Sequence, residues 1–221
     1  MISVGNLLRI GLVVPAIMVA DVLVAQHMFP GFRPGAQFIS ELGGPKAPNP
    51  QIFNIGMILA GLAGVAAGAG FAQALEHAGG RRQVSAFAGL WVAMTGLGAL
   101  FAGLFHWPDP MHRACGVGLA IQFAPLFTAW ALWGKPAHRR LARFSLGWFF
   151  FLLLVLALLT GVWNVRTGND VGFWQRGHAA LGLLWLAIAA FCLDRHWRGR
   201  DAPTASGDGD SADPDYAPAA S

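Results

Sequence analysis

Long uncharged apolar runs dominate this chain of 221 residues. Five runs contain no Asp, Glu, Lys or Arg, and a sixth, residues 10–32, is interrupted only by Asp21. The five uncharged runs are 47–75, 83–108, 114–134, 144–165 and 177–193. All or most of each run would cross the ~30 Å hydrocarbon core of a bilayer, which takes a helix of roughly 20 residues. Because the bilayer core holds no water, such a segment has to satisfy its own backbone groups, as a helix does.

The pattern therefore predicts an all-α, polytopic transmembrane helix bundle with six spans. We place these spans at residues 7–27, 52–74, 85–105, 114–133, 144–164 and 177–194. They form one membrane domain over residues 1–198, followed by a tail over residues 199–221. The tail is rich in Asp, Ser, Gly, Pro and Ala, so it cannot bury a core. We expect a disordered, acidic, cytoplasmic tail.

Composition and charge agree with a membrane protein. Hydrophobic residues make up 55% of the chain and charged residues 12%, against about 25% charged in soluble domains. The net charge of +4 does not indicate nucleic-acid binding, because the basic residues lie in short loops beside apolar runs. Ten Lys and Arg residues fall on the side that holds both chain ends and five on the other side. The positive-inside rule then predicts cytoplasmic termini.

The first connecting loop, residues 28–49, is unusually apolar for a solvated loop. It carries several large apolar side chains, namely Phe29, Phe32, Phe38, Ile39 and Leu42. We expect it to fold back over the outer end of the bundle and to place Ser40 and Glu41 there. Two interpretations remain open. The pair could be catalytic, or it could belong to a helix cap or turn that stops at Gly43 and Gly44.

Imidazole and carboxylate groups gather near the same face. The second outer loop contains His106, Asp109 and His112, and His178 stands near the start of the last span. His and Asp are suitable zinc ligands, which makes these four residues a candidate metal site. The structural alternative assigns Asp109 as the N-cap of span four, with Pro110 at its first helical position. For His178 the alternative is an interhelical hydrogen bond.

Three further polar residues are candidates for a site, two for binding and one as a charge within the membrane. Gln175 and Arg176 precede span six and could contact a substrate or a lipid headgroup. Arg176 could instead pair with Glu41 or Asp109, or place its charge at the membrane interface. Asp21 lies within the outer half of span one, where a charge is costly and faces the bundle interior or water.

Small residues and prolines shape two of the spans. Ala60, Gly64 and Gly68 recur every four positions in span two, and such a stripe lets helix backbones approach closely. The stripe serves either packing within the chain or a homodimer. Pro15 and Pro125 lie inside spans one and four, where each removes a helix hydrogen bond and can bend the helix.

Three short motifs follow one another along the chain. They are Ser40-Glu-Leu-Gly43, Gly103-Leu-Phe105 ahead of Asp109-x-x-His112, and Gln175-Arg176 ahead of a last span that contains Trp185. In combination they resemble a bacterial integral membrane family, domain of unknown function 998. The resemblance covers roughly residues 5–197. It implies a multi-pass protein of the bacterial inner membrane with about six spans, and it supplies no activity. His106 departs from the Phe-Pro-x-Asp segment that is frequent in that family.

Three functional hypotheses follow. The first is a non-catalytic membrane protein, such as a packing or assembly partner, that carries a polar Ser/Glu/Asp/His/Arg cluster at its outer face. The second is a metal-dependent hydrolase of a lipid or amide, with zinc as a possible ion, Glu41 as general base and Ser40 contacting the substrate oxygen. It is similar, distantly, to the alkaline ceramidase and adiponectin-receptor group, whose His-x-x-x-His motif is absent from this last span. The third is a proton-coupled transporter that uses Asp21, Gln122 and Asn164.

Overall fold

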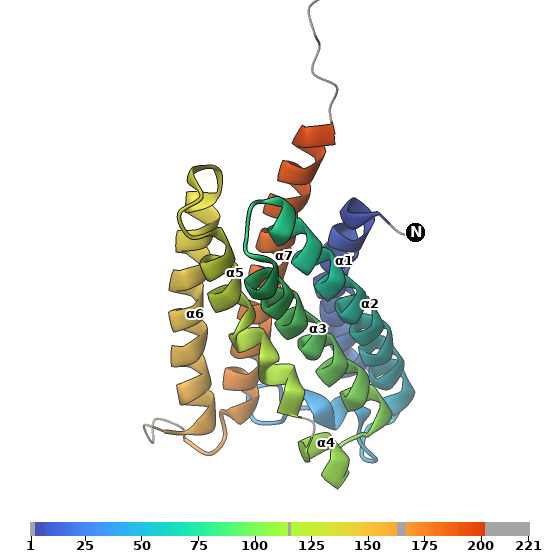
Figure 1. Ribbon diagram of the computed structural model, residues 1–221. Coiled ribbons are helices and arrows are strands. Elements are labelled where there is room, and N and C mark those ends of the chain that lie inside the picture. Colours follow the sequence, from blue (N-terminus) through green and yellow to red (C-terminus); the bar gives the residue numbers. More distant parts are fainter. Residues whose placement is uncertain (1–2, 115, 163–166, 202–221) are drawn as a thin grey trace, which may run out of the picture.

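The computed structural model describes residues 3–114, 116–162 and 167–201, and within these ranges it contains helices, turns and loops but no strand (Figure 1). The elements follow one another as α1 (Val4–His27), η1 (Ile39–Gly43), α2 (Pro50–His77), α3 (Arg82–Leu104), α4 (Pro110–Ala114), η2 (Gly116–Gln122), α5 (Ala124–Leu132), η3 (Pro136–His138), α6 (Arg139–Thr160) and α7 (Val171–Asp201), where η marks a 3-10 helix. Asn164 and residues 202–221 of the predicted tail lie outside the described residues.

Within the described residues, five helical segments are long and apolar enough to cross a membrane. They are Val4–His27, Pro50–His77, Arg82–Leu104, Pro136–Thr160 and Val171–Gly199. The predicted all-α membrane bundle is thus confirmed, and each of these segments overlaps one predicted span. Local signals set their ends: the Ser3 side chain accepts a hydrogen bond from the Asn6 N–H, and Gly161 stops α6 with a left-handed φ of 76°.

The fourth predicted span differs from the prediction because it is broken. In place of one helix over 114–133, the chain forms α4, η2 and α5 in succession. Asp109 does cap α4 as predicted, since its Oδ1 accepts a 2.7 Å hydrogen bond from the Met111 N–H. Gly116 and Gly118 favour helix weakly, and Pro125 lacks the N–H that would continue it. Pro125 therefore stands in the first turn of α5 instead of bending a continuous helix.

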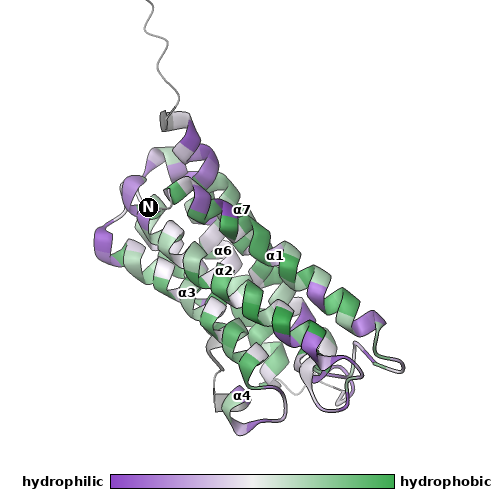
Figure 2. Ribbon diagram, turned by 90° about the vertical axis from the view of Figure 1, so that its right-hand side faces the viewer, coloured by the Kyte–Doolittle hydropathy of each residue, from purple (hydrophilic) through white to green (hydrophobic). Residues whose placement is uncertain are grey.

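The bundle has two distinct ends. The start of α1, the last turns of α7, the α2–α3 turn and the α5–α6 turn lie at one of them, which we name the termini end (Figure 1). The loop 28–49 with η1, the helix α4 and the start of α7 lie at the other, which we name the loop end. Hydrophobic residues run along the helices, and hydrophilic residues gather toward the two ends (Figure 2). Such a distribution suits a bundle whose middle lies in hydrocarbon.

Glycines bring α2 and α3 into backbone contact. A Cβ at Gly64 would lie 2.8 Å from the Gly96 Cα, and one at Gly61 would lie 2.5 Å from the Leu100 nitrogen. Gly68 meets Gly89 and Ala93 in the same way. The small-residue stripe is thus occupied within the chain, as the packing interpretation predicts. A homodimer through this face would have to replace the α2–α3 contact.

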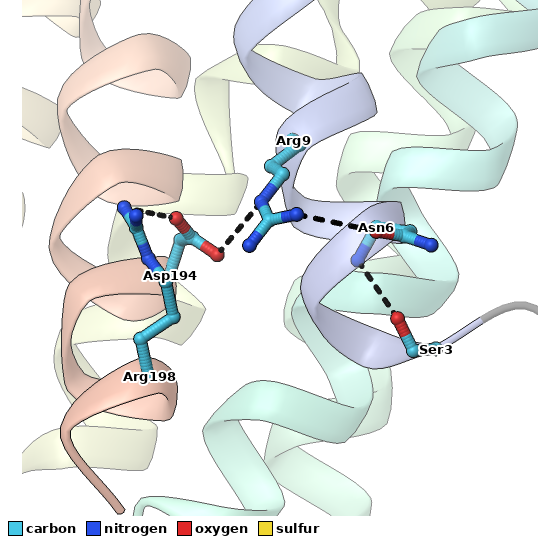
Figure 3. A network of polar contacts seen from close by, with 5 residues as sticks. All are labelled: Ser3, Asn6, Arg9, Asp194 and Arg198. Atoms are coloured by element: carbon cyan, nitrogen blue, oxygen red, sulfur yellow. Dashed lines mark hydrogen bonds and ion pairs between the residues drawn. The ribbon is translucent and has the colours of Figure 1, made fainter. Parts of the chain in front are cut away.

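An ion-pair cluster joins α1 to α7 at the termini end (Figure 3). Asp194 is 1% exposed, and its carboxylate lies 2.6 Å from Nη2 of Arg198 and 3.6 Å from Nε of Arg9. Arg9 also donates to the Asn6 side chain at 3.4 Å. Both arginine side chains are about half exposed, so Asp194 is the buried member of the cluster. It depends on these two cations for compensation of its charge.

We expect Asp194→Asn to lower the free energy of unfolding by about 1–2 kcal/mol. This is less than the ~3–5 kcal/mol for breaking a fully buried pair, because solvent screens both arginines. The matched control is Asp21→Asn, which neutralises another buried aspartate, one with no ion pair among the described residues. That change should leave stability equal or higher. Thermal unfolding in detergent measures both, and equal losses would contradict the assignment.

Candidate functional site

The loop 28–49 folds back onto the bundle, as predicted. Leu42 is 1% exposed and packs in a cluster with Ala25 of α1, Phe53 of α2 and Ala99 of α3. Phe29, Phe32 and Ile39 pack against the same cluster. The apolar side chains of the loop therefore anchor η1 across the loop end, and this brings Ser40 into a buried position.

Glu41 stabilises the turn that carries it. Its Oε1 accepts a 2.9 Å hydrogen bond from the Phe38 N–H, and its Oε2 accepts a 3.0 Å bond from the Gln37 side chain. This matches the cap interpretation, because a Glu in the third position of a helix commonly accepts the N–H of the capping residue. Both carboxylate oxygens thus already have donors from the loop.

The start of α7 holds the same loop from the other side. Gln175 accepts a 2.6 Å hydrogen bond from the Ile39 N–H through its Oε1. Arg176 donates from Nη1 to the carbonyl oxygens of Pro34 at 2.5 Å, Gln37 at 2.9 Å and Gly172 at 3.2 Å. No ion pair joins Arg176 to Glu41 or Asp109 among the described residues, although Glu41 attracts Arg176 at longer range. The two carboxylates accept hydrogen bonds from Gln37, Phe38 and Met111 instead.

His178 makes the interhelical hydrogen bond of the structural alternative. It is 4% exposed, and its Nε2 lies 3.3 Å from Oε1 of Gln122. An amide oxygen only accepts, so Nε2 carries the proton and Nδ1 remains an acceptor. Gln122 is 2% exposed, and its amide donates at 3.1 Å to the Phe149 carbonyl oxygen. One side chain of η2 therefore connects α6 and α7.

The remaining metal candidates lie in different surroundings. His106 and Asp109 are exposed, whereas His112 is half-buried and its Nδ1 lies 2.7 Å from the Phe105 carbonyl oxygen. That contact fixes the proton on Nδ1 and leaves Nε2 as the acceptor. The part of the chain that the structure describes contains no group of three or more His, Cys, Asp or Glu side chains placed to hold a metal ion. A zinc site stays a prediction.

Asp21 faces α2 in the interior of the bundle. It is 8% exposed, and its carboxylate lies where a Cβ of Gly56 would be. Its Oδ2 is buried without a hydrogen-bond partner in the structure. The prediction that this charge faces the bundle interior is confirmed, and no arginine pairs with it among the described residues.

A pocket of about 450 Å³ lies between the helices on the loop-end side of the bundle. Apolar side chains form most of its wall, with Val19 and Leu23 from α1, Met57 from α2 and Leu183 and Leu186 from α7 among them. Gly64, Gly96 and Ala99 also line it, so the small residues of α2 and α3 leave room on this face as well as packing together. Pockets of this size and character hold ligands in other proteins.

Polar groups converge on one end of the pocket. Ser40, His112, Gln175, Arg176 and His178 all line it. Glu41 is not among the lining residues and instead faces a separate hollow of about 160 Å³ with Lys46 and Trp107. The structure thus brings five candidates together around one space and separates Glu41 from Ser40, its neighbour in the chain. Exposed Asp109 and His106 are also outside the pocket wall.

The mouth of the pocket is apolar. Val19 and Leu23 line the pocket and are 51% and 59% exposed. Both belong to α1, one of the helices apolar enough to span a membrane. Leu119 of η2 lines the pocket too and is 42% exposed. The sequence reasoning missed this pocket, because alternating large and small apolar residues are typical of every packed membrane helix.

Comparison with known proteins identifies a family but no activity. The family model described as "Protein of unknown function (DUF998)" matches residues 12–192. No curated protein and no solved structure matches the chain. The matched segment includes the loop 28–49, the broken segment and the polar pocket residues Ser40, His112, Gln175, Arg176 and His178.

Proposed function

This chain belongs to the DUF998 family of unknown function, and from its pocket we propose that it is an integral membrane protein that binds an amphipathic lipid. The observation that carries the proposal is the 450 Å³ pocket with an apolar wall and a polar end. This combination fits a molecule with a hydrocarbon chain and a polar headgroup. The function agrees with the first hypothesis, a non-catalytic membrane protein with a polar cluster at one face.

The position of the mouth supports a ligand that arrives from the bilayer. Val19 and Leu23, the exposed lining residues of α1, present apolar surface in a segment suited to hydrocarbon. A lipid can enter there with its chain always in an apolar environment. A water-soluble ligand would have to cross the apolar wall, or pass the loop that Leu42 holds against the bundle.

Filling the pocket should remove the bound lipid. Ala102→Leu and Ala179→Leu add bulk at two lining positions. Overpacking of about 1–3 kcal/mol would weaken binding of oleyl alcohol by about 5- to 150-fold. The control is Ala69→Leu, which makes the same change at an exposed position of α2 that does not line the pocket. Native mass spectrometry of the full chain from detergent measures occupancy, and equal occupancy in all variants would overturn the proposal.

Hydrolysis of a lipid or amide is a second candidate, favoured by one observation. Ser40, His112 and His178 all line the polar end of the same pocket. If the protein is a hydrolase, an N-acyl amide should be cleaved by the wild type and not by Ser40→Ala. Stoichiometric zinc that is lost in His112→Ala and His178→Ala would assign a metal-dependent reaction. Intact amide and metal-free protein would exclude this candidate.

The pocket proposal is consistent with six crossings, the fourth of them broken. The seven residues of η2 rise ~2.0 Å each and the nine of α5 ~1.5 Å each, so together they cover about 27 Å. Six crossings place both chain ends on one face, and the ten-to-five bias of basic residues assigns that face to the cytoplasm. Reporter fusions at the two ends test this orientation, and opposite locations of the ends would exclude it.

A further inference from the structure

The guanidinium of Arg176 is used on one side only. Nη1 donates to three backbone carbonyls, of Pro34, Gln37 and Gly172. Nε and Nη2 are both buried and have no hydrogen-bond partner in the structure. These two nitrogens form one edge of the planar group, with parallel N–H bonds that match the two oxygens of a carboxylate or phosphate. Buried donors without partners are costly, so an unfilled edge of this kind calls for an explanation.

No carboxylate of the described chain fills that edge. The nearest candidate along the loop, Glu41, already accepts from Gln37 and Phe38. Among the described residues that line the pocket there is no Asp or Glu, and Arg176 is the sole charged residue apart from histidines. The Phe32 ring covers one face of the guanidinium, with its centroid 5.3 Å from Cζ, and this contact also favours a positive charge there. Glu41 attracts this cation at longer range, but no carboxylate of the described chain forms a hydrogen bond with its Nε and Nη2 edge.

Neighbouring groups add donors to this end. The Ser40 hydroxyl can donate, and Gln175 has its amide nitrogen available because only its oxygen takes part in the bond to Ile39. These two residues line the pocket with Arg176. By contrast, the acceptor nitrogen Nε2 of His112 would suit a hydroxyl, or an acid that keeps its proton. The choice is between an anionic headgroup and a neutral one. The positive charge of Arg176 favours the anion, because a guanidinium is ionised at any working pH.

We propose that the lipid in the pocket carries an oxyanion, a carboxylate or a phosphate, bound by the Nε and Nη2 edge of Arg176. Both nitrogens are covered in the structure, so the headgroup reaches them only when the neighbouring side chains move aside. This inference rests on the proposed function and specifies its ligand. A hydrocarbon chain gains little on moving from the bilayer into an equally apolar pocket. Selectivity therefore has to come from the polar end, where a charge-assisted, two-point contact is the strongest interaction on offer.

A matched set of ligands tests the headgroup without altering the protein. Oleic acid, oleyl phosphate and oleyl alcohol share one chain and differ in charge, and at pH 8 the first two are anionic in solution. We expect the full-length protein to bind at least one of the two anions about 10- to 100-fold more tightly than the alcohol, as for charge-assisted hydrogen bonds. Acetate and inorganic phosphate, which lack the chain, should not compete at equal concentration.

Variants then assign the preference to Arg176. Arg176→Lys keeps the charge but loses the two-point edge, and Arg176→Gln loses the charge as well. Both should reduce the anion preference, measured as the ratio of anion affinity to oleyl alcohol affinity, about tenfold or more. This ratio separates the headgroup contact from any change in the pocket caused by the lost Nη1 bonds, which would weaken binding of all three ligands alike. Arg33→Gln is the control, because it removes an exposed charge from the same loop.

The outcomes separate the two proposals. Equal affinities for acid, phosphate and alcohol would overturn the headgroup inference while leaving lipid binding in place. Binding of none of the three would overturn lipid binding and the inference with it. Competition by inorganic phosphate or acetate at the affinity of the long-chain ligand would show a site for free anions and would overturn the lipid assignment. An anion preference that survives in Arg176→Gln would exclude Arg176 as its cause.

Discussion

Gly96→Leu is expected to prevent the bundle from folding. A Cβ at Gly96 would lie 2.5 Å from the Val65 nitrogen, 2.7 Å from the Gly61 oxygen and 2.7 Å from the Gly64 carbonyl carbon. All three are backbone atoms of α2, so no side-chain rotation relieves the overlap. The two helices would have to separate along the closest helix pair of the fold, at a cost above about 3 kcal/mol. We expect aggregation or loss of the monodisperse peak in size-exclusion chromatography.

Gly147→Leu provides the matched control for this prediction. Gly147 also lies inside an apolar helix, α6, but a Cβ there meets no atom within 4 Å. Its replacement removes a weak helix former and should be neutral or stabilising by up to about 1 kcal/mol. If both variants are folded with similar melting temperatures, α2 and α3 do not make this contact. If neither variant folds, the loss of folding cannot be assigned to the α2–α3 contact, and this explanation of the Gly96→Leu result is contradicted.

The apolar runs suffice to predict most of the fold, because every segment that crosses hydrocarbon has to satisfy its own backbone hydrogen bonds by forming a helix. The helices α1, α2, α3, α6 and α7 all begin and end within a few residues of a predicted span or its flanking turns. Charged loops and caps mark these boundaries, as at Ser3 and Gly161. What a run cannot show is whether its helix is continuous, since an apolar composition is equally compatible with a broken segment.

The broken segment shows where the pattern is insufficient. Residues 114–133 are as apolar as any other predicted span, and Pro125 signals only a bend. The 3-10 turn of η2 persists because tertiary contacts compensate for it, with Gln122 donating to the Phe149 carbonyl and bonding His178. Two polar side chains from different helices have to meet for this, and their separation of 56 positions makes the pairing invisible to a local pattern.

The candidate site was predictable by residue type but not by arrangement. The sequence offers the cap at Asp109 and the interhelical bond of His178 as structural alternatives to metal binding, and the structure contains both contacts. It also places Ser40 beside Glu41, whereas the turn of η1 directs only Ser40 to the large pocket. The orientation of the Arg176 guanidinium is set by three carbonyl oxygens, two from the loop 28–49 and one from the first turn of α7. Because the loop is far from Arg176 in the sequence, no sequence motif reveals which edge of the group is left without a partner.

Trp185→Ala is the second change with a large expected effect, because this side chain fixes α7 and with it one wall of the pocket. The indole is 0% exposed, donates from Nε1 to the Ser145 hydroxyl at 3.1 Å, and packs against Phe71 with ring centroids 5.9 Å apart. Its removal leaves a cavity where α7 meets α2 and α6. In water-soluble proteins such a truncation costs ~3–5 kcal/mol, partly from lost water-to-core transfer and partly from lost packing contacts. In lipid only the packing contribution remains, so we expect the free energy of unfolding to fall by about 2–4 kcal/mol.

Two further tryptophan variants separate packing from hydrogen bonding. Trp185→Phe keeps most of the ring and loses the donor, so it should cost only about 1 kcal/mol. Trp133→Ala removes an indole that is 60% exposed, and its effect should stay within about 0.5 kcal/mol. Thermal unfolding of the three variants in one detergent gives the order of their stabilities.

Since α7 also carries Arg176 and His178, Trp185→Ala should weaken oleate binding in proportion to its loss of stability. Full oleate affinity in a destabilised Trp185→Ala protein would mean that the pocket wall does not depend on this anchor.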